Sequence, residues 1–214
     1  SELTERKRIM EIKQLEEQFN PHFIFNVLET LRYEIAIDAA KASDMVMAFA
    51  NLMRYSIYYG STIVPLQTDI EYINDYLLLQ KMRYNRRLNY HIDIPEELMG
   101  CKIPKLLLQP VVENSLVHGM KDIRSIAINI SAWKEKGQLK LCVEDNGSGI
   151  REEKLEELRK GLEREDVYRE HIGLYNSHRV VRLLYGPESG MTIESSPGNG
   201  TKVTVTLPAD MEEI

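Results

Sequence analysis

Residues 108–119 read LQPVVENSLVHG, and this stretch decides the fold of the second half of the chain. Together with the apolar residues just before it, the stretch predicts a helix from about Lys105 to Gly119, which the glycine ends. Asn114 and His118 are four residues apart, so they share one face of that helix. An amide oxygen on such a face can coordinate Mg2+, which prefers oxygen ligands and keeps waters and substrate phosphates around it. The same two side chains can also merely cap or solvate the helix end, so the stretch alone leaves the function open.

Two further motifs follow in residues 143–150 (VEDNGSGI) and 196–201 (SPGNGT). In the first, Asp145 leaves a strand and enters a loop that contains Gly147 and Gly149. A carboxylate at a strand end can accept the exocyclic amine of adenine, and the glycines let the backbone approach the base. The second carries Gly200 and Thr201 and by itself predicts a hairpin turn. Because Asp-Asn-Gly is also a common turn, the order of the three motifs is more informative than any one of them.

The pattern around these motifs alternates strands with helices. Leu88 to Ile94 alternate apolar and polar residues, which predicts a strand that Pro95 ends. Further strands are expected at residues 126–133, 139–144, 191–195 and 202–207, and helices at residues 152–165 and 174–184. Strands interleaved with helices predict an α/β sandwich, with helices on one face of a mixed sheet.

The first half of the chain has helical periodicity instead. An amphipathic helix is expected from Leu3 to about Ile37; Pro21 either kinks it or restarts it with Asn20 as N-cap. Apolar stripes then continue at helical spacing in two segments, Ile24, Leu28, Leu31 and Ile35, and Met45, Phe49, Leu52, Met53 and Ile57. Another helix is expected from Leu66 to about Tyr84. We therefore expect a helical domain in residues 1–84 and an α/β domain in residues 85–214.

The composition narrows the function classes. A formal net charge of −6 with 28% charged residues argues against nucleic-acid binding, which needs a clustered excess of Lys and Arg. The two cysteines, Cys101 and Cys142, lack the spacing of a zinc site or a disulfide framework, which fits a reducing cytosol. No run of 18 apolar residues and no signal peptide occurs, so we expect contact with a membrane only through a sensor region that this chain does not contain.

Taken together, the three motifs resemble the N, G1 and G2 boxes of the Bergerat (GHKL) ATP-binding domain, which gyrase, the Hsp90 chaperone, sensor histidine kinases and the mismatch-repair protein MutL share. The resemblance covers about residues 100–208 and implies ATP and Mg2+ as ligands. It implies that Asn114 holds Mg2+, that His118 lies beside the phosphates, and that Asp145 binds adenine. The residues around the adenine would be Gly147, Gly149, Gly200 and Thr201.

The same resemblance also implies a mobile lid over the ATP site. Gly173, Leu174 and Asn176 match the family segment that follows the lid, so residues 150–172 would form it. We expect this charged stretch to be mobile, because it offers few apolar anchors. The family subgroup usually carries a Lys before the N-box His; Val117 stands there, and Lys121 is the nearest substitute.

Residues 18–26, QFNPHFIFN, separate the kinases from the other branches. They resemble the phosphoacceptor signature N-P-H-F-x-F-N of the LytS- and YesM-like sensor histidine kinases, whose members also carry L-Q-P-x-V-E-N. With that class the resemblance extends over essentially the whole chain. It implies that His22 takes a phosphoryl group from Mg-ATP and that the group passes to an aspartate of a response regulator receiver domain. It also implies the cytoplasmic part of a membrane receptor.

A homodimer is expected as well, because the two short helices of one chain bury little, whereas two pairs form a four-helix bundle around one core. The expected fold is therefore a dimeric helical hairpin that carries the phosphoacceptor, followed by the α/β sandwich.

The histidine needs partners that the motif does not name. The common kinase classes place an acid directly after the histidine, but Phe23 stands there, and Glu29 or Glu17 are the nearest acids. Asn26 lies one turn from His22 and either positions water for dephosphorylating the partner or is structural. Two other functions stay open: an ATPase in which Glu113 activates water, and a dimeric scaffold without catalysis.

Overall fold

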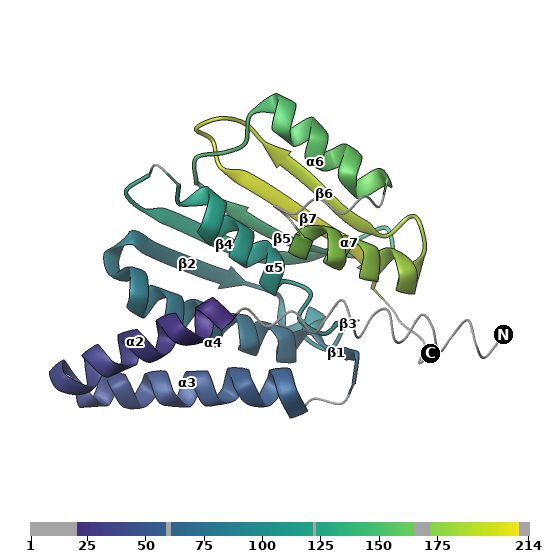
Figure 1. Ribbon diagram of the computed structural model, residues 1–214. Helices are drawn as coiled ribbons and strands as arrows, with labels where there is room; N and C mark the ends of the chain where they lie inside the picture. The colour runs from purple at the N-terminus through teal and green to yellow at the C-terminus, as the bar shows by residue number, and fades with distance from the viewer. Residues whose placement is uncertain (1–20, 59–60, 122, 165–171, 210–214) are drawn as a thin grey trace.

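The computed structural model describes residues 21–58, 61–121, 123–164 and 172–209. The helix expected before Pro21, with Asn20 and Glu17, lies outside the described residues. The first described elements are three helices, α2 (Pro21–Ile37), α3 (Ala39–Tyr58) and α4 (Leu66–Tyr84). Asp38 separates α2 from α3 and caps α3, because its carboxylate accepts a hydrogen bond of 3.1 Å from the Lys41 N–H. The expected hairpin is therefore present in the chain, with α4 packed against both of its helices (Figure 1).

The face of α2 that packs against the rest of the chain differs from the expected stripe. Phe23 and Val27 are buried, and the Phe23 ring lies 5.0 Å from that of Tyr76 on α4. Leu28 and Ile35, which belong to the expected stripe, are 46% and 62% exposed. Apolar residues extend round more than one face of α2, and periodicity alone does not tell which face meets the same chain.

The second half forms a five-stranded mixed sheet, as expected. Its strands, in spatial order, are β2 (Leu88–Asp93), β4 (Ile126–Glu135), β5 (Gln138–Asp145), β7 (Thr201–Pro208) and β6 (Gly190–Ser195). Only the β2–β4 pair is parallel among these neighbours. The helices α5 (Gln109–Asn114), α6 (Glu152–Arg164) and α7 (Ile172–Tyr185) lie on one face of the sheet (Figure 1). The α/β sandwich predicted from the sequence is confirmed.

Several short elements were not predicted. β1 (Ile63–Pro65) pairs antiparallel with β3 (Lys102–Pro104), which joins the segment before α4 to the segment before α5. Single turns of 3-10 helix follow α4 (η1, Asn85–Arg87) and β2 (η2, Glu96–Leu98), and α5 continues into a π-helical turn, η3 (Ser115–Gly119). Three-residue strands lack the alternation that reveals a strand in a sequence.

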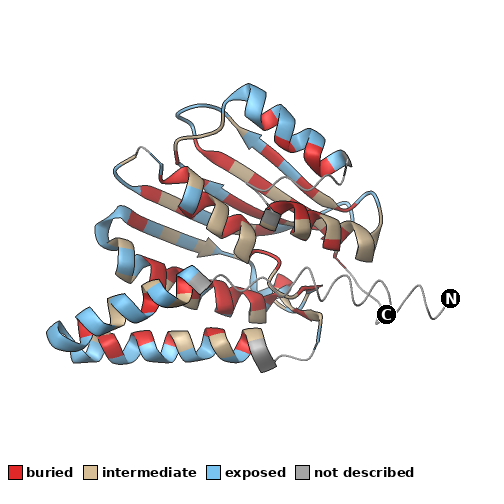
Figure 2. Ribbon diagram, viewed as in Figure 1, coloured by how far each residue is buried: buried red, intermediate tan, exposed pale blue. Residues whose placement is uncertain are grey.

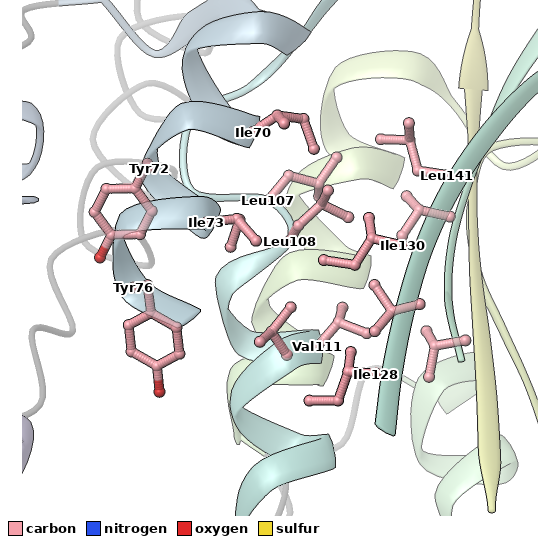
Figure 3. Packing of buried hydrophobic residues seen from close by; sticks show 14 of the residues in the cluster. Ile70, Tyr72, Ile73, Tyr76, Leu107, Leu108, Val111, Ile128, Ile130 and Leu141 are labelled. Atoms are coloured by element: carbon pink, nitrogen blue, oxygen red, sulfur yellow. The ribbon is translucent and has the colours of Figure 1, made fainter. Parts of the chain in front are cut away.

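One hydrophobic core runs from the helices into the sheet (Figures 2 and 3). Ile70 and Ile73 of α4 face Leu107 and Leu108, and Val111 of α5 follows (Figure 3). Ile128, Ile130 and Leu141 of the sheet close this core on the far side (Figure 3). The division after residue 84 remains a prediction, but in this structure α4 contributes to the same core as the sheet. Across the described ranges, no helix combines the length and the apolar character needed to cross a membrane.

Candidate nucleotide and phosphoacceptor site

Asp145, at the end of β5, joins the three sequence motifs. Its carboxylate is buried and accepts hydrogen bonds from the Ser115 hydroxyl at 2.6 Å, the Gly147 N–H at 2.9 Å and the Thr201 N–H at 3.3 Å. Burial raises the pKa of the Asp145 carboxyl, and the three hydrogen bonds act against that rise. One donor comes from each motif, so residues 30 and 56 positions away in sequence meet at this carboxylate.

Glycines let the backbone segments around Asp145 approach one another. A Cβ atom on Gly147 would lie 2.5 Å from both the Cα and the carbonyl oxygen of Gly119 and 2.7 Å from Asp145 Oδ1. Gly200 has a positive φ of 76°, and a Cβ on it would overlap the Asp145 carbonyl oxygen. No side chain fits at either position, so the glycine backbone packs directly against Asp145.

Loop hydrogen bonds hold the second and third motifs together. The Ser148 N–H donates to the Gly119 carbonyl at 2.9 Å, and the Ser148 carbonyl accepts from the Gly198 N–H at 2.8 Å. On the other side of Gly149, the Ile150 N–H donates to the Ser195 hydroxyl at 2.9 Å. These hydrogen bonds bring together the two loops that carry Gly147, Gly149 and Gly200.

The helix that carries Asn114 and His118 begins later than predicted. It starts at Gln109 rather than Lys105, and its last turn, which includes His118, is π-helical. Leu106 has a positive φ of 59°, which a leucine in a helix does not adopt. Asn114 and His118 are both partly exposed near the end of this element.

A buried carboxylate that the sequence analysis missed explains the late start. Asp69 of α4 is fully buried and accepts hydrogen bonds from the Leu106 N–H at 2.7 Å and the Leu108 N–H at 3.4 Å. The Tyr55 hydroxyl of α3 donates to the same carboxylate at 3.0 Å. Burial raises the pKa of Asp69 to about 6. Asp69 thus ties the hairpin to the turn from which the Asn114 helix starts.

His22 lies in a second, neighbouring cleft of about 370 Å³. The lining residues come from α2, from α4 and η1, and from the helix of Asn114: His22, Phe23, Asn26, Tyr76, Gln80, Arg83, Tyr84, Arg87, Glu113, Leu116, Val117, Met120 and Lys121. The Asn26 amide lies 3.0 Å from His22 Nδ1. Val117 of the Asn114 helix and Lys121, just after that helix, therefore share a cleft with the predicted acceptor.

The acidic residue in this cleft is not the one considered first. Glu29 is exposed and is absent from the described residues that line the cleft, whereas Glu113 lines it. Glu113 accepts a hydrogen bond of 2.8 Å from the Gln109 amide, and burial raises its pKa. Helical spacing from His22 suggested Glu29, whereas Glu113 comes to the same cleft from a helix that is far from His22 in the sequence.

The segment after the expected lid packs against the start of α5. A Cβ atom on Gly173 would lie 2.8 Å from Pro110 Cβ, and Leu174 is buried. These residues of α7 therefore contact the helix that carries Asn114, while Asn176 is partly exposed.

The first part of the expected lid is a packed helix. Leu155, Leu158 and Leu162 of α6 are at most 5% exposed, and the Arg159 guanidinium donates to the Ile193 carbonyl at 3.0 Å and 2.7 Å. The premise that residues 150–172 offer few apolar anchors was wrong, because three leucines at helical spacing form one buried stripe. Residues 165–171 lie outside the described ranges.

Comparison with known proteins agrees with this arrangement. Residues 10–88 match the family described as Histidine kinase, and residues 102–211 match the family described as Histidine kinase-, DNA gyrase B-, and HSP90-like ATPase, which indicates an ATP-binding domain. The chain is 32% identical over 208 residues, or 97% of its length, to the Sensor protein kinase HptS of Staphylococcus aureus strain USA300. It spans 40% of the length of that relative.

Two solved structures of the catalytic domain of the histidine kinase ThkA, both nucleotide-free, have the same fold. Their TM-scores are 0.54 and 0.53 at 15% and 14% identity, and the alignments cover 71% and 69% of this chain and 98% and 95% of theirs. At such low sequence identity, these two structures support the fold and nothing about the function. The two family matches follow each other along the chain in the order of the acceptor and nucleotide motifs, and the chain therefore belongs to the sensor histidine kinase family.

Proposed function

We propose that this chain phosphorylates His22 from Mg-ATP and passes the phosphoryl group to an aspartate of a response regulator receiver domain. The observation that carries the proposal is the shared cleft, in which His22 of α2 and the helix of Asn114 face one another. A phosphoryl acceptor must come close to the nucleotide, since transfer depends mostly on positioning and charge neutralisation.

The nucleotide is held by the residues around Asp145. The Asp145 carboxylate accepts a hydrogen bond from the adenine amine. The backbone at Gly147, Gly149, Gly200 and Thr201 bounds the base. Asn114 is the Mg2+ ligand and His118 lies beside the phosphates. A Mg2+ ion held by one amide takes its other ligands from waters and phosphates. Mg2+ there neutralises charge on the phosphates.

The reaction takes place at a ring nitrogen of His22. We place it at Nε2, opposite the Nδ1 atom that Asn26 holds at 3.0 Å. The structure places Asn26 Nδ2 beside Nδ1, where an amide nitrogen can only donate. The proposed reaction needs the amide turned by half a turn, so that Oδ1 accepts from Nδ1–H and Nε2 carries the lone pair. The Nε2 lone pair attacks the γ-phosphorus, the bond from phosphorus to the β,γ-bridging oxygen breaks, and ADP leaves with that electron pair. During the attack Nδ1–H donates a hydrogen bond to Asn26 Oδ1, which orients the ring. The phosphorylated ring is first an imidazolium, and its Nδ1 proton then passes to solvent to give the neutral phosphoramidate.

The exposed apolar side chains of the hairpin support a homodimer. Phe25, Leu28 and Ile35 on α2 and Val46 and Met47 on α3 are all between 46% and 67% exposed in the single chain. A second hairpin covers such a surface in a four-helix bundle. The receiver domain binds beside His22, because the phosphoryl group has to reach its aspartate. The relatives are longer than this chain, which spans 40% of the length of the Sensor protein kinase HptS. In the whole protein, we place this part on the cytoplasmic side of a membrane receptor.

Incubation with γ-labelled ATP tests the proposal. The parent chain acquires acid-labile label on protein, and His22→Gln abolishes that label while nucleotide affinity stays within about two-fold, since His22 is not part of the nucleotide site. His91→Gln, which changes an exposed histidine on β2, serves as the matched control and labels like the parent. Normal labelling of His22→Gln overturns the acceptor assignment. Free phosphate without protein label favours the ATPase, and nucleotide binding without either product favours the scaffold.

A further inference from the structure

We propose that the cleft around His22 is also a binding site for the phosphoryl group after transfer, in which Arg83, Arg87 and Lys121 of the same chain hold the phosphorylated side chain. This inference rests on the proposed phosphorylation of His22. It adds a residence site for the product of that reaction, formed by residues outside the sequence motifs of the nucleotide site.

The charge of the cleft is opposite to that of the protein. The chain has 27 Lys and Arg residues against 33 Asp and Glu residues. Among the described residues that line the cleft, the cations are Arg83, Arg87 and Lys121, and the only acid is Glu113. The cations come from the end of α4, from η1 and from the segment after η3, so the fold gathers them around His22.

The two arginines are oriented by local contacts. Arg87 donates from Nε to the Arg124 carbonyl at 3.0 Å and from Nη2 to the Ile123 carbonyl at 3.3 Å. The Arg83 guanidinium lies 5.0 Å from the centre of the Tyr84 ring. A guanidinium held in this way loses less side-chain entropy when it binds an anion.

A phosphoryl group on His22 has the charge and the acceptors that such a site binds. A phosphoryl group on a side chain is anionic at neutral pH and offers three strong acceptor oxygens. Arginine binds phosphate oxygens with charge-assisted, often paired hydrogen bonds. The apolar walls, which include Phe23, Leu116 and Met120, lower the local dielectric and strengthen these interactions. The site therefore disfavours protonation of the phosphohistidine and lowers its pKa.

Arg83, Arg87 and Lys121 could instead bind the γ-phosphate of ATP, which offers the same oxygen acceptors as the phosphoryl group on His22. The two ligands are distinguishable because the phosphohistidine is covalent. A cation that serves the phosphohistidine changes the titration of that group, whereas a cation that serves ATP changes nucleotide affinity.

The experiment is a 31P NMR pH titration of phosphohistidine in the full chain. The test variant is Arg83→Gln/Lys121→Gln, and the control is Arg86→Gln/Lys81→Gln, which removes the same charge from residues that line a different cleft. All proteins are phosphorylated in two ways, with Mg-ATP and with phosphoramidate, a small chemical donor that needs no kinase activity. His22→Gln identifies the His22 resonance, since that resonance is missing in its spectrum.

In the parent and the control we expect the pKa of the phosphohistidine, read from its 31P shift, to be lower than in the test variant by about one pH unit, because nearby cations disfavour the uptake of a proton. Equal pKa values in the test variant and the control overturn the inference. Unchanged pKa values together with weaker ATP binding in the test variant assign the cations to ATP and likewise overturn it. A His22 resonance that appears only with phosphoramidate refutes the proposed autophosphorylation, and the pKa comparison then still decides whether the cleft holds the phosphoryl group.

Discussion

Asp69 and Asp145 are two buried carboxylates with the same kinds of partner and different surroundings. Each accepts hydrogen bonds from two backbone N–H groups and one hydroxyl, Tyr55 for Asp69 and Ser115 for Asp145. Burial raises the pKa of both. The N–H donors to Asp69 belong to leucines and its hydroxyl donor is a tyrosine, whereas the backbone of three glycines lies against Asp145.

This difference separates a structural carboxylate from one in a ligand site. Neither burial, nor a raised pKa, nor the number of hydrogen bonds distinguishes the two residues. What distinguishes them is the close approach of Gly119, Gly147 and Gly200 to Asp145, where any Cβ atom would meet a neighbour at 3.1 Å or less. We therefore expect the adenine at Asp145, where bare backbone from the three motifs meets the carboxylate.

Removal of the Asp69 carboxylate gives the largest expected effect. Asp69→Ala should lower the free energy of unfolding by about 4 kcal/mol, because it leaves two buried N–H groups and a buried hydroxyl without their acceptor. Urea unfolding measures this change. Glu71→Ala, an exposed acid on the same helix, should stay within about 0.5 kcal/mol of the parent. A small change for Asp69→Ala would contradict the view that this residue joins the hairpin to the Asn114 helix.

The pH dependence of stability tests the same carboxylate. The pKa of Asp69 is raised from 3.8 to about 6 in the folded chain, so the folded state binds the proton more tightly than the unfolded state does. Its contribution to stability is therefore complete below pH 4 and is lost as the pH rises to 6, by up to about 3 kcal/mol. Asp69→Asn does not titrate and should lack this slope. Equal slopes for the parent and Asp69→Asn between pH 4 and pH 6 would refute the assignment.

Substitution of Asp145 should affect binding more than stability. Asp145→Asn keeps the size of the side chain, but its NH2 group faces groups that themselves donate hydrogen bonds, such as the Gly147 and Thr201 N–H. The substitution also removes the negative charge that strengthens the hydrogen bond from the adenine amine. We expect the Kd for ATP to rise about 30-fold, which corresponds to about 2 kcal/mol. Calorimetric titration measures it, and Asp69→Asn, in its folded state, should bind ATP within a few-fold of the parent. If the two variants lost the same affinity, the contrast between the two carboxylates would be wrong.

Local patterns in the sequence explain why much of the fold was predictable. Alternation in β2 and β4, helical spacing in α4 and α7, and loop glycines at Gly147 and Gly200 depend only on neighbouring residues. The three motifs around Asp145 were recognised for the same reason, since each is a contiguous stretch. Even α6 carried a readable signal, because Leu155, Leu158 and Leu162 follow helical spacing within a charged segment.

The tertiary structure alone decided which distant residues meet. Asp69 binds Leu106, which lies 37 residues further on, and this contact rather than local propensity sets the start of α5 at Gln109. Glu113 and Lys121 reach the cleft of His22 only because α4 brings α2 and the Asn114 helix together. The sequence determined the elements and the chemistry they carry, because both are local. The structure decided the partners of Asp69 and His22, because contacts between distant segments depend on how the whole chain packs.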